Sequence, residues 1–373
     1  MTVSLASIIA DLESKIANAD SSSSLSDLLS LLNSAERLTG TKSVYDSSEL
    51  LTTAAEEGSV KFQNDGSLRF YNGTNWDLLD DPSYVAPLNN QGVASGYTAG
   101  GNPLISDIQK YSYTSDGNAL DVGDLTSARR RLSGSSSTAS GYVHGGMSPP
   151  YSNVIEKFPY AANGTATDVG NLTVARQHLA GASSSAHGYS MGGDYPNRNV
   201  IDKYAFSADG DATDVGDLLG SITYLGASSS TTHGYVHGGG PSLPGTNVIQ
   251  KFSFSVDGNS TDVGDLTEVV VYPAGSNSST HGYRMGGGQP TITNSIDKYS
   301  YSSDGNATDV GDLLAQVNNL AGNSSTSHGY GAGGNASGAS NVIQKFPFSV
   351  DENSTDVGDL ATAVRETASN LQV

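Results

Sequence analysis

One repeat of about 47 residues recurs six times between residue 86 and the C-terminus. A Gly-Tyr step sets its phase, and successive tyrosines are 45, 47, 46, 48 and 47 residues apart, at Tyr97, Tyr142, Tyr189, Tyr235, Tyr283 and Tyr330. Each tyrosine is followed by Gly-Gly, then by an Ile-x-Lys-aromatic run and then by Asp-Val-Gly-Asp/Asn-Leu. A fixed period of this length is typical of β-propellers and solenoids, and it constrains the fold more than any local feature does.

Each repeat contains four short segments with strand patterns. In the repeat around Tyr189, residues 180–184 are small, residues 188–191 form a second segment, residues 199–206 alternate between two faces, and residues 214–218 form a short edge. Four strands in about 40–50 residues make one propeller blade. We therefore expect a six-bladed β-propeller, with a stacked β-solenoid as the alternative.

The two ends of the repeat region favour a closed ring over a stack. Residues 361–373 follow the last Asp-Val-Gly-Asp-Leu and correspond to the small-residue strand that precedes Gly-Tyr elsewhere. The first repeat opens directly with its Gly-Tyr strand, at residues 93–99, and lacks that small-residue strand. The C-terminal strand is therefore expected to complete the first blade and leave no open sheet edge, whereas a stack would need caps at both ends.

Composition and charge limit the functions that are open to the chain. The formal net charge of −20 disfavours nucleic-acid binding. There is no cysteine, which removes disulfides, thiolate zinc sites and cysteine nucleophiles. No apolar run of about 18 residues occurs, so no membrane span is expected. Neither a Ser-His-Asp spacing nor a P-loop nor a dinucleotide fingerprint stands out, and we expect a chain that is not an enzyme and carries no cofactor.

The repeat resembles the kelch repeat, in which an apolar strand ending in Gly-Gly is followed by an aromatic strand and by a short strand leading into an Arg. Residues 142–146, 153–160 and 168–176 follow that order. The late Trp of kelch repeats is absent, Asp-Val-Gly-Asp-Leu stands in its place, and several blades lack the Arg. The resemblance implies a mainly β, kelch-like six-bladed propeller and says little about function.

The six repeats differ little in sequence, and in this they resemble the repeats of propellers in structural proteins of marine bacteriophages. Residues 58–79 also resemble a small β module of phage tail and fibre proteins, and they hold the only tryptophan, Trp76. These resemblances imply a virion protein, such as a tail or neck fibre or decoration subunit, whose partners are other virion proteins and a host surface glycan or receptor. Two alternatives stay open: a cellular or secreted kelch-like interaction module, and a propeller glycan hydrolase, which would need unique acids clustered on one face.

Residues 1–57 are expected to form a helical segment for assembly or anchoring. Leu5, Ile8, Ile9, Leu12 and Ile16 form one apolar stripe at helical spacing, and leucines between residues 25 and 32 begin a second. Helices this short are marginal alone in water, so the stripes are expected to pack on other protomers or virion proteins, or back on the chain. The expected parts are therefore residues 1–57, a small β module with a linker over residues 58–85, and the propeller over residues 86–373, in a homo-oligomer.

Four histidines occupy the position two residues before the tyrosine, at His187, His233, His281 and His328, where the first two blades have Ser95 and Ser140. Four imidazoles aimed at a central channel would suit a metal ion. Because serine replaces histidine in two blades, we favour hydrogen bonds to the backbone of a neighbouring blade.

Acidic and lysine residues also recur in every blade. In the fifth, Asp304, Asn306, Asp309 and Asp312 could hold a structural calcium ion, but Asp-Gly and Asn-Gly steps make tight turns without one, and we favour turns. The lysines are expected to pair with Asp residues of neighbouring blades, and they are Lys110, Lys157, Lys203, Lys251, Lys298 and Lys345.

Variation between repeats is concentrated in one loop per blade, between Gly-Gly and the Ile-x-Lys run. Varied loops on a rigid scaffold are where binding sites lie, although drift in unconstrained hairpin tips would also vary. Tyr151, Tyr195 and Arg198 belong to the loops of adjacent blades and are expected to form one binding patch, with Gln289 as a further binding residue. No catalytic residue and no metal ligand is assigned.

Overall fold

The computed structural model describes residues 60–62, 68–71, 76–78 and 92–373, apart from residues 242, 244, 289, 290, 370 and 373. The chain divides into two compact units, Met1–Val85 and Ala86–Val373. The described residues contain strands and no helix, hence none that could cross a membrane. The expected helical segment of residues 1–57 lies outside the described residues.

The first unit contains a small antiparallel sheet. Its strands β1 (Val60–Phe62), β2 (Leu68–Tyr71) and β3 (Trp76–Leu78) lie in the order β1-β2-β3. The register pairs Lys61 with Arg69 and Phe70 with Asp77. A β structure therefore forms within the segment that the sequence assigns to a small β module.

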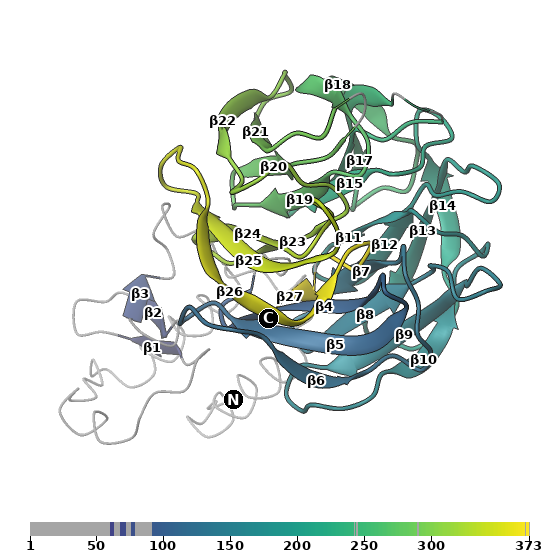
Figure 1. Cartoon of the computed structure of the whole chain (residues 1–373), viewed down its shortest axis with the longest axis horizontal. Coiled ribbons are helices and arrows are strands. Elements are labelled where there is room, and N and C mark those ends of the chain that lie inside the picture. The colour runs from purple at the N-terminus through teal and green to yellow at the C-terminus, as the bar shows by residue number, and fades with distance from the viewer. Residues whose placement is uncertain are drawn as a thin grey trace, which may run out of the picture. The chain divides into compact units, whose positions relative to one another are not determined.

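The second unit is a six-bladed β-propeller, in which each blade is a four-stranded antiparallel sheet (Figure 1). The innermost strands are β27 (Leu371–Gln372), β7 (Ser133–Ser136), β11 (Ala180–Ser183), β15 (Gly226–Ser229), β19 (Ala274–Asn277) and β23 (Ala321–Ser324). The second strands are β4 (Ser95–Gly101), β8 (Ser140–His144), β12 (His187–Met191), β16 (His233–His237), β20 (His281–Met285) and β24 (His328–Ala332). The prediction of six blades is confirmed.

The outer half of each blade comes from the Ile-x-Lys and Asp-Val-Gly runs. The third strands are β5 (Ile105–Ser112), β9 (Val154–Pro159), β13 (Val200–Ala205), β17 (Thr246–Ser253), β21 (Ser295–Ser300) and β25 (Ser340–Pro347). The outermost strands are β6 (Leu120–Asp124), β10 (Thr167–Asn171), β14 (Thr213–Asp217), β18 (Thr261–Val270), β22 (Thr308–Asp312) and β26 (Thr355–Val364). Blade one holds β27, β4, β5 and β6, and blades two to six follow in chain order.

The C-terminal strand closes the ring, as the sequence predicts. β27 pairs with β4 in antiparallel register, with Leu371 opposite Tyr97 and Gln372 opposite Gly96. Blade one is thus built from both ends of the propeller unit, and the stacked-solenoid alternative is wrong. Closure leaves no open edge on the innermost side of this blade.

Small residues in the innermost strands allow the blades to approach the axis closely. A Cβ atom on Gly181 of β11 would lie 1.9 Å from the carbonyl oxygen of Gly134 in β7. Non-bonded carbon and oxygen atoms do not approach this closely, so any larger residue at position 181 would force the two blades apart. The Gly- and Ser-rich composition of these strands follows from this crowding.

The tyrosine of each Gly-Tyr step packs against the blade that follows it. Tyr142 stacks on Phe206 of blade three with ring centroids 4.8 Å apart, and Tyr330 of blade six lies 4.5 Å from Tyr113 of blade one. The other pairs are Tyr97 with Tyr160, Tyr189 with Phe254, Tyr235 with Tyr301 and Tyr283 with Phe348. Such pairs contribute about 0.5–1.5 kcal/mol each beyond area burial. The constant aromatic positions therefore stabilise the six contacts between blades.

The Asp-Val-Gly run makes a bulge that fits the next blade. In blade two, Asp168 Oδ1 accepts a hydrogen bond from the Gly170 N–H at 3.2 Å, and the strand register shifts between these residues. A Cβ atom on Gly170 would lie 2.1 Å from the carbonyl oxygen of Gly210 in blade three. Only glycine permits this approach, which explains why the run is constant.

Five of the six repeated lysines pair with an Asp of the following blade. The pairs are Lys157–Asp209, Lys203–Asp257, Lys251–Asp304, Lys298–Asp351 and Lys345–Asp116, at 2.5–2.7 Å. The prediction of pairing between blades is confirmed for these five and is wrong for Lys110. Blade two has Asn163 where the other blades have Asp, and the Lys110 ammonium instead lies 5.6 Å from the centroid of the Tyr97 ring.

Antiparallel strands place the connections of each blade alternately on two faces. The turn from the first to the second strand and the loop from the third to the fourth strand share one face with the Lys–Asp pairs. We call it the constant face. The loop from the second to the third strand and the link into the next blade lie on the opposite face. This second face carries the six variable loops, and we call it the variable face.

Candidate functional site

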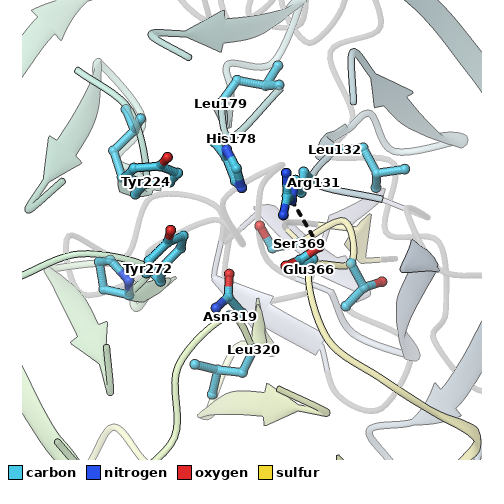
Figure 2. Close-up of a pocket in the computed structure, with 13 residues that line it drawn as sticks. Arg131, Leu132, His178, Leu179, Tyr224, Tyr272, Asn319, Leu320, Glu366 and Ser369 are labelled. Carbon is cyan, nitrogen blue, oxygen red and sulfur yellow. Dashed lines mark hydrogen bonds and ion pairs between the residues drawn. The ribbon is translucent and has the colours of Figure 1, made fainter. Parts of the chain in front are cut away.

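One position of the repeat lines the mouth of the central channel on the variable face. It lies in the link between blades, two residues before the innermost strand in five of the six blades, and holds five residue types in six blades. We call its members the channel-mouth ring: Arg131, His178, Tyr224, Tyr272, Asn319 and Glu366. Figure 2 shows these six side chains arranged around the channel in chain order.

The backbone of the channel-mouth ring is a closed circle of hydrogen bonds. Each ring N–H donates to the carbonyl oxygen of the ring residue before it, from 2.7 Å between Arg131 N and Glu366 O to 3.2 Å between Tyr224 N and His178 O. All six residues have positive φ, between 53° and 63°. This conformation costs non-glycine residues about 1–2 kcal/mol each, and the circle of hydrogen bonds offsets that cost.

A cavity of about 70 Å³ opens inside this circle and is lined by all six ring side chains. Its walls also include the residues that directly follow five of the ring residues, namely Leu132, Leu179, Leu225, Pro273 and Leu320. Sites that bury a whole small molecule have volumes of about 300–1,000 Å³. This cavity therefore receives one functional group of a ligand and leaves the rest of that ligand on the rim.

One side of the channel mouth is charged. Arg131 Nε donates to Glu366 Oε2 at 3.1 Å, and Arg131 Nη1 donates to Gln177 Oε1 at 3.2 Å. Arg130 Nη1 lies 3.6 Å from the same Glu366 oxygen. Both guanidinium groups keep about a quarter of their side-chain surface exposed, so they stay accessible to a ligand.

The opposite side of the channel mouth is aromatic (Figure 2). The rings of Tyr224 and Tyr272 have centroids 4.4 Å apart, and the His178 ring lies 4.4 Å from Tyr224. His178 Nδ1 contacts Asp194 Oδ2 at 3.2 Å. Burial lowers the pKa of His178 against the opposing effect of Asp194, and burial raises the pKa of Tyr224 and of Tyr272.

The variable loops adjoin the channel-mouth ring. Gln177, next to ring residue His178, forms a β-bridge with Asp194, the first residue of the loop in blade three. Arg130, next to ring residue Arg131, forms the same bridge with Met147 in blade two. The loops and the ring therefore belong to one continuous surface.

Two of the predicted binding residues come together on this surface. The rings of Tyr151 and Tyr195 stack with centroids 4.6 Å apart and an interplanar angle of 20°, and Tyr195 is 59% exposed. Arg198 is half-buried in the same loop as Tyr195, and no contact among the described residues joins its side chain to the tyrosine pair. Gln289 lies outside the described residues. The two tyrosines of the predicted patch are therefore in contact, while the binding role of the patch and of Arg198 stays a prediction.

The four repeated histidines do not point into the channel mouth. They begin the second strands on the constant face, and His233, His281 and His328 hydrogen-bond through Nδ1 to the hydroxyl of the preceding residue at 2.8 Å. The predicted hydrogen bonds to a neighbouring blade's backbone are therefore wrong for these three. Burial lowers the pKa of all four imidazoles.

The acidic residues of blade five serve contacts within and between blades. Asp304 pairs with Lys251, Asn306 Oδ1 accepts the Asp265 N–H at 3.1 Å, and Asp309 Oδ1 accepts the Gly311 N–H at 3.2 Å. Among the described residues, no three His, Asp or Glu side chains are grouped to hold a metal ion.

The channel-mouth ring is not among the sites that the sequence predicts. The residue before Leu132, Leu179, Leu225, Pro273 and Leu320 differs between blades, but so do the link residues that precede it, such as Arg130, Gln177 and Thr223. Variation in the link therefore does not mark the one position whose side chains meet around the channel.

Comparison with known proteins assigns no relationship to this chain. No family model matches it, and no curated protein matches it.

Proposed function

We propose that this chain is a non-enzymatic binding protein that presents the variable face of its propeller to a partner. The proposed setting is a bacteriophage virion, in which the chain is a tail or neck fibre or decoration subunit. In this proposal residues 1–57 attach homo-oligomers to the particle. The partner on the variable face is a host surface glycan or receptor, or another virion protein.

The observation that carries the proposal is the contrast between the two faces. The constant face repeats the same Lys–Asp pairs in five of six blades. The variable face holds different side chains in each blade, including the exposed Tyr151–Tyr195 stack. Exposed aromatic side chains are enriched at binding hot spots because they bury a large area and lose little conformational entropy.

The carboxylates at the channel mouth support a binding role over hydrolysis. A glycan hydrolase uses one carboxyl group as an acid and a second as a base or nucleophile. Glu366 is engaged by Arg131 and Arg130, and Asp194 is engaged by His178. The virion setting is supported by the resemblance of the repeats and of residues 58–79 to phage structural proteins.

The binding role is tested with Tyr151→Ala combined with Tyr195→Ala in the full-length chain. Loss of one hot spot worth about 1.4 kcal/mol weakens attachment to bacterial cells or phage particles roughly tenfold. The matched control is Leu120→Ala with Val256→Ala, because both side chains are 69% exposed and lie on the constant face. Equal loss of attachment in both variants, or no attachment by the unaltered protein, would refute the binding role. Immunogold electron microscopy of particles from an infected culture tests the virion setting, which is wrong if particles carry no label.

A further inference from the structure

The positive charge of the propeller is distributed unevenly. Six lysines occupy the repeated position, and Arg129, Arg176 and Arg284 are buried against Glu156, Asp202 and Asp297. The remaining basic residues of the propeller are Arg130, Arg131, Arg198 and Arg365, and all four belong to links or loops of the variable face. Three of these arginines converge beside the cavity at the channel mouth.

This cluster of Arg130, Arg131 and Arg365 is tied together by two side chains. Glu366 contacts Arg131 and Arg130 as described above. With its amide oriented for hydrogen bonding, Asn102 Oδ1 accepts from Arg130 Nη1 at 3.1 Å and from Arg365 Nε at 3.2 Å. Arg365 Nη1 also donates to Asn335 Oδ1 at 3.0 Å. The three guanidinium groups of this cluster lie near two carboxylates, those of Glu366 and Asp194, so the cluster carries a formal excess of one positive charge on a chain of net charge −20.

The guanidinium groups keep donors for a ligand. Each guanidinium carries five N–H donors in a planar fork that matches the two oxygens of a carboxylate. Arg131 uses Nε for Glu366 and Nη1 for Gln177, which leaves Nη2 without a partner among the described contacts. The arrangement suits an anion with two oxygens in one plane.

We infer that the channel mouth binds the carboxylate of an acidic sugar in a surface glycan. This inference rests on the proposed binding function and specifies its ligand class. The carboxylate enters the cavity beside Arg131 and Arg130, and the sugar ring packs its C–H face on Tyr224 and Tyr272. Asn319, which lines the cavity, supplies an amide group for the sugar hydroxyls.

A sugar fits this mixture of groups better than an acidic peptide does. Sugar rings present flat C–H faces beside hydroxyls, and the channel mouth presents flat aromatic rings beside amides and cations. Since the cavity is small, the remaining glycan runs over the rim. The stacked Tyr151 and Tyr195 adjoin the same surface, because Asp194 contacts His178 and precedes Tyr195 directly.

The test measures binding of the full-length protein to a panel of oligosaccharides that end in galacturonic, glucuronic or N-acetylneuraminic acid. Each is compared with its carboxyl-reduced counterpart. We expect at least one acid to bind tenfold or more tightly than its reduced form, and binding to weaken as salt is raised. We expect Arg131→Gln and Arg130→Gln each to lower that affinity tenfold or more, because each removes a charge-assisted hydrogen bond.

Lys203→Gln is the matched control, since it removes one positive charge from the constant face. It should leave oligosaccharide binding unchanged, and thermal melts check that each variant is folded. If Arg131→Gln does not fold, Arg130→Gln decides. Binding equal to that of the reduced sugars, or equal effects of Arg130→Gln and Lys203→Gln, overturns the inference. If cells or particles are bound while no acid on the panel is preferred, the inference fails and the proposed function stands; if nothing is bound, the proposed function fails.

Discussion

The most demanding prediction concerns a buried ion pair in blade three. Arg176 Nη1 lies 3.0 Å from Asp202 Oδ2, and both side chains are 0% exposed. Asp202 also accepts the Thr173 N–H, and Arg176 Nη2 donates to the carbonyl oxygen and the hydroxyl of Ser190. Replacing Arg176 with Ile leaves the Asp202 carboxylate buried without its cation, which costs about 3–5 kcal/mol.

Blade four has uncharged residues at the positions of this ion pair. There Gln250 Oε1 accepts the Leu219 N–H at 2.9 Å and the Ser260 hydroxyl at 2.7 Å, and Ile222 and Val236 occupy the places of Arg176 and Ser190. A quadruple variant transfers this arrangement to blade three, and it combines Arg176→Ile, Ser190→Val, Asp202→Gln and Ala212→Ser. Because every buried polar group is again partnered, we expect a stability within about 1.5 kcal/mol of the original protein.

Thermal and urea unfolding measure both variants. The propeller unit spans residues 86–373. With an unfolding entropy of about 2.1 cal/mol/K per residue, a loss of about 3–5 kcal/mol lowers the Tm of a unit of this size by about 5–8 °C. The quadruple variant should recover most of that loss. A quadruple variant that is as unstable as Arg176→Ile would refute the reasoning, since the neutral arrangement would then depend on features of blade four outside these four positions.

Three further predictions concern protonation, the lysine pairs and closure. Burial lowers the pKa of His144 and of His237 from 6.5 to about 3, so the unfolded chain binds more protons between these values, and stability that is complete above pH 6.5 is lost as the pH falls towards 3. The double variant His144→Met, His237→Met copies the residues of blades three and five. Urea titrations at pH 8 and pH 5 should show that the stability difference between these pH values is smaller in the variant by about 2 kcal/mol per histidine replaced. An unchanged pH profile would contradict this. Asn163→Asp should give Lys110 a partner and stabilise the propeller by about 0.2–1 kcal/mol, whereas the same variant combined with Lys110→Met should gain nothing. Removal of residues 361–373 should sharply lower the Tm and cause association in analytical ultracentrifugation, and an unchanged monomeric melt would show that β27 does not close the ring.

The sequence predicts those features that depend on spacing and strand pattern. The Gly-Tyr step, the lysine run and the Asp-Val-Gly run each have a local pattern that fixes their strand and their face. Once six equal blades close into a ring, a residue that recurs in each blade must contact its neighbour, and the Lys–Asp pairs follow from this. The exception at Lys110 was readable from Asn163 only after the pairing partner of each lysine was known.

Side chains that converge through the closure of the ring were not predictable in the same way. Arg131 and Glu366 are far apart in the sequence and meet because blade six returns to blade one. His144 and His237 stand where the other blades have Ala or Met, and only the packing between blades shows that both rings are fully buried. Arg198 and Tyr195 are three residues apart, yet one is half-buried and the other is exposed, because the short loop turns between them.

The channel-mouth ring explains how so regular a propeller carries an irregular site. At Gly170 and Arg176 the side chain, or its absence, is part of a contact between blades, so a change there affects stability. At the ring positions the contacts between blades are backbone hydrogen bonds, which any residue that tolerates positive φ can make. The side chains are therefore free to differ, and they differ where all six meet around one cavity. Substitution in this ring can change the ligand while the six blades stay the same.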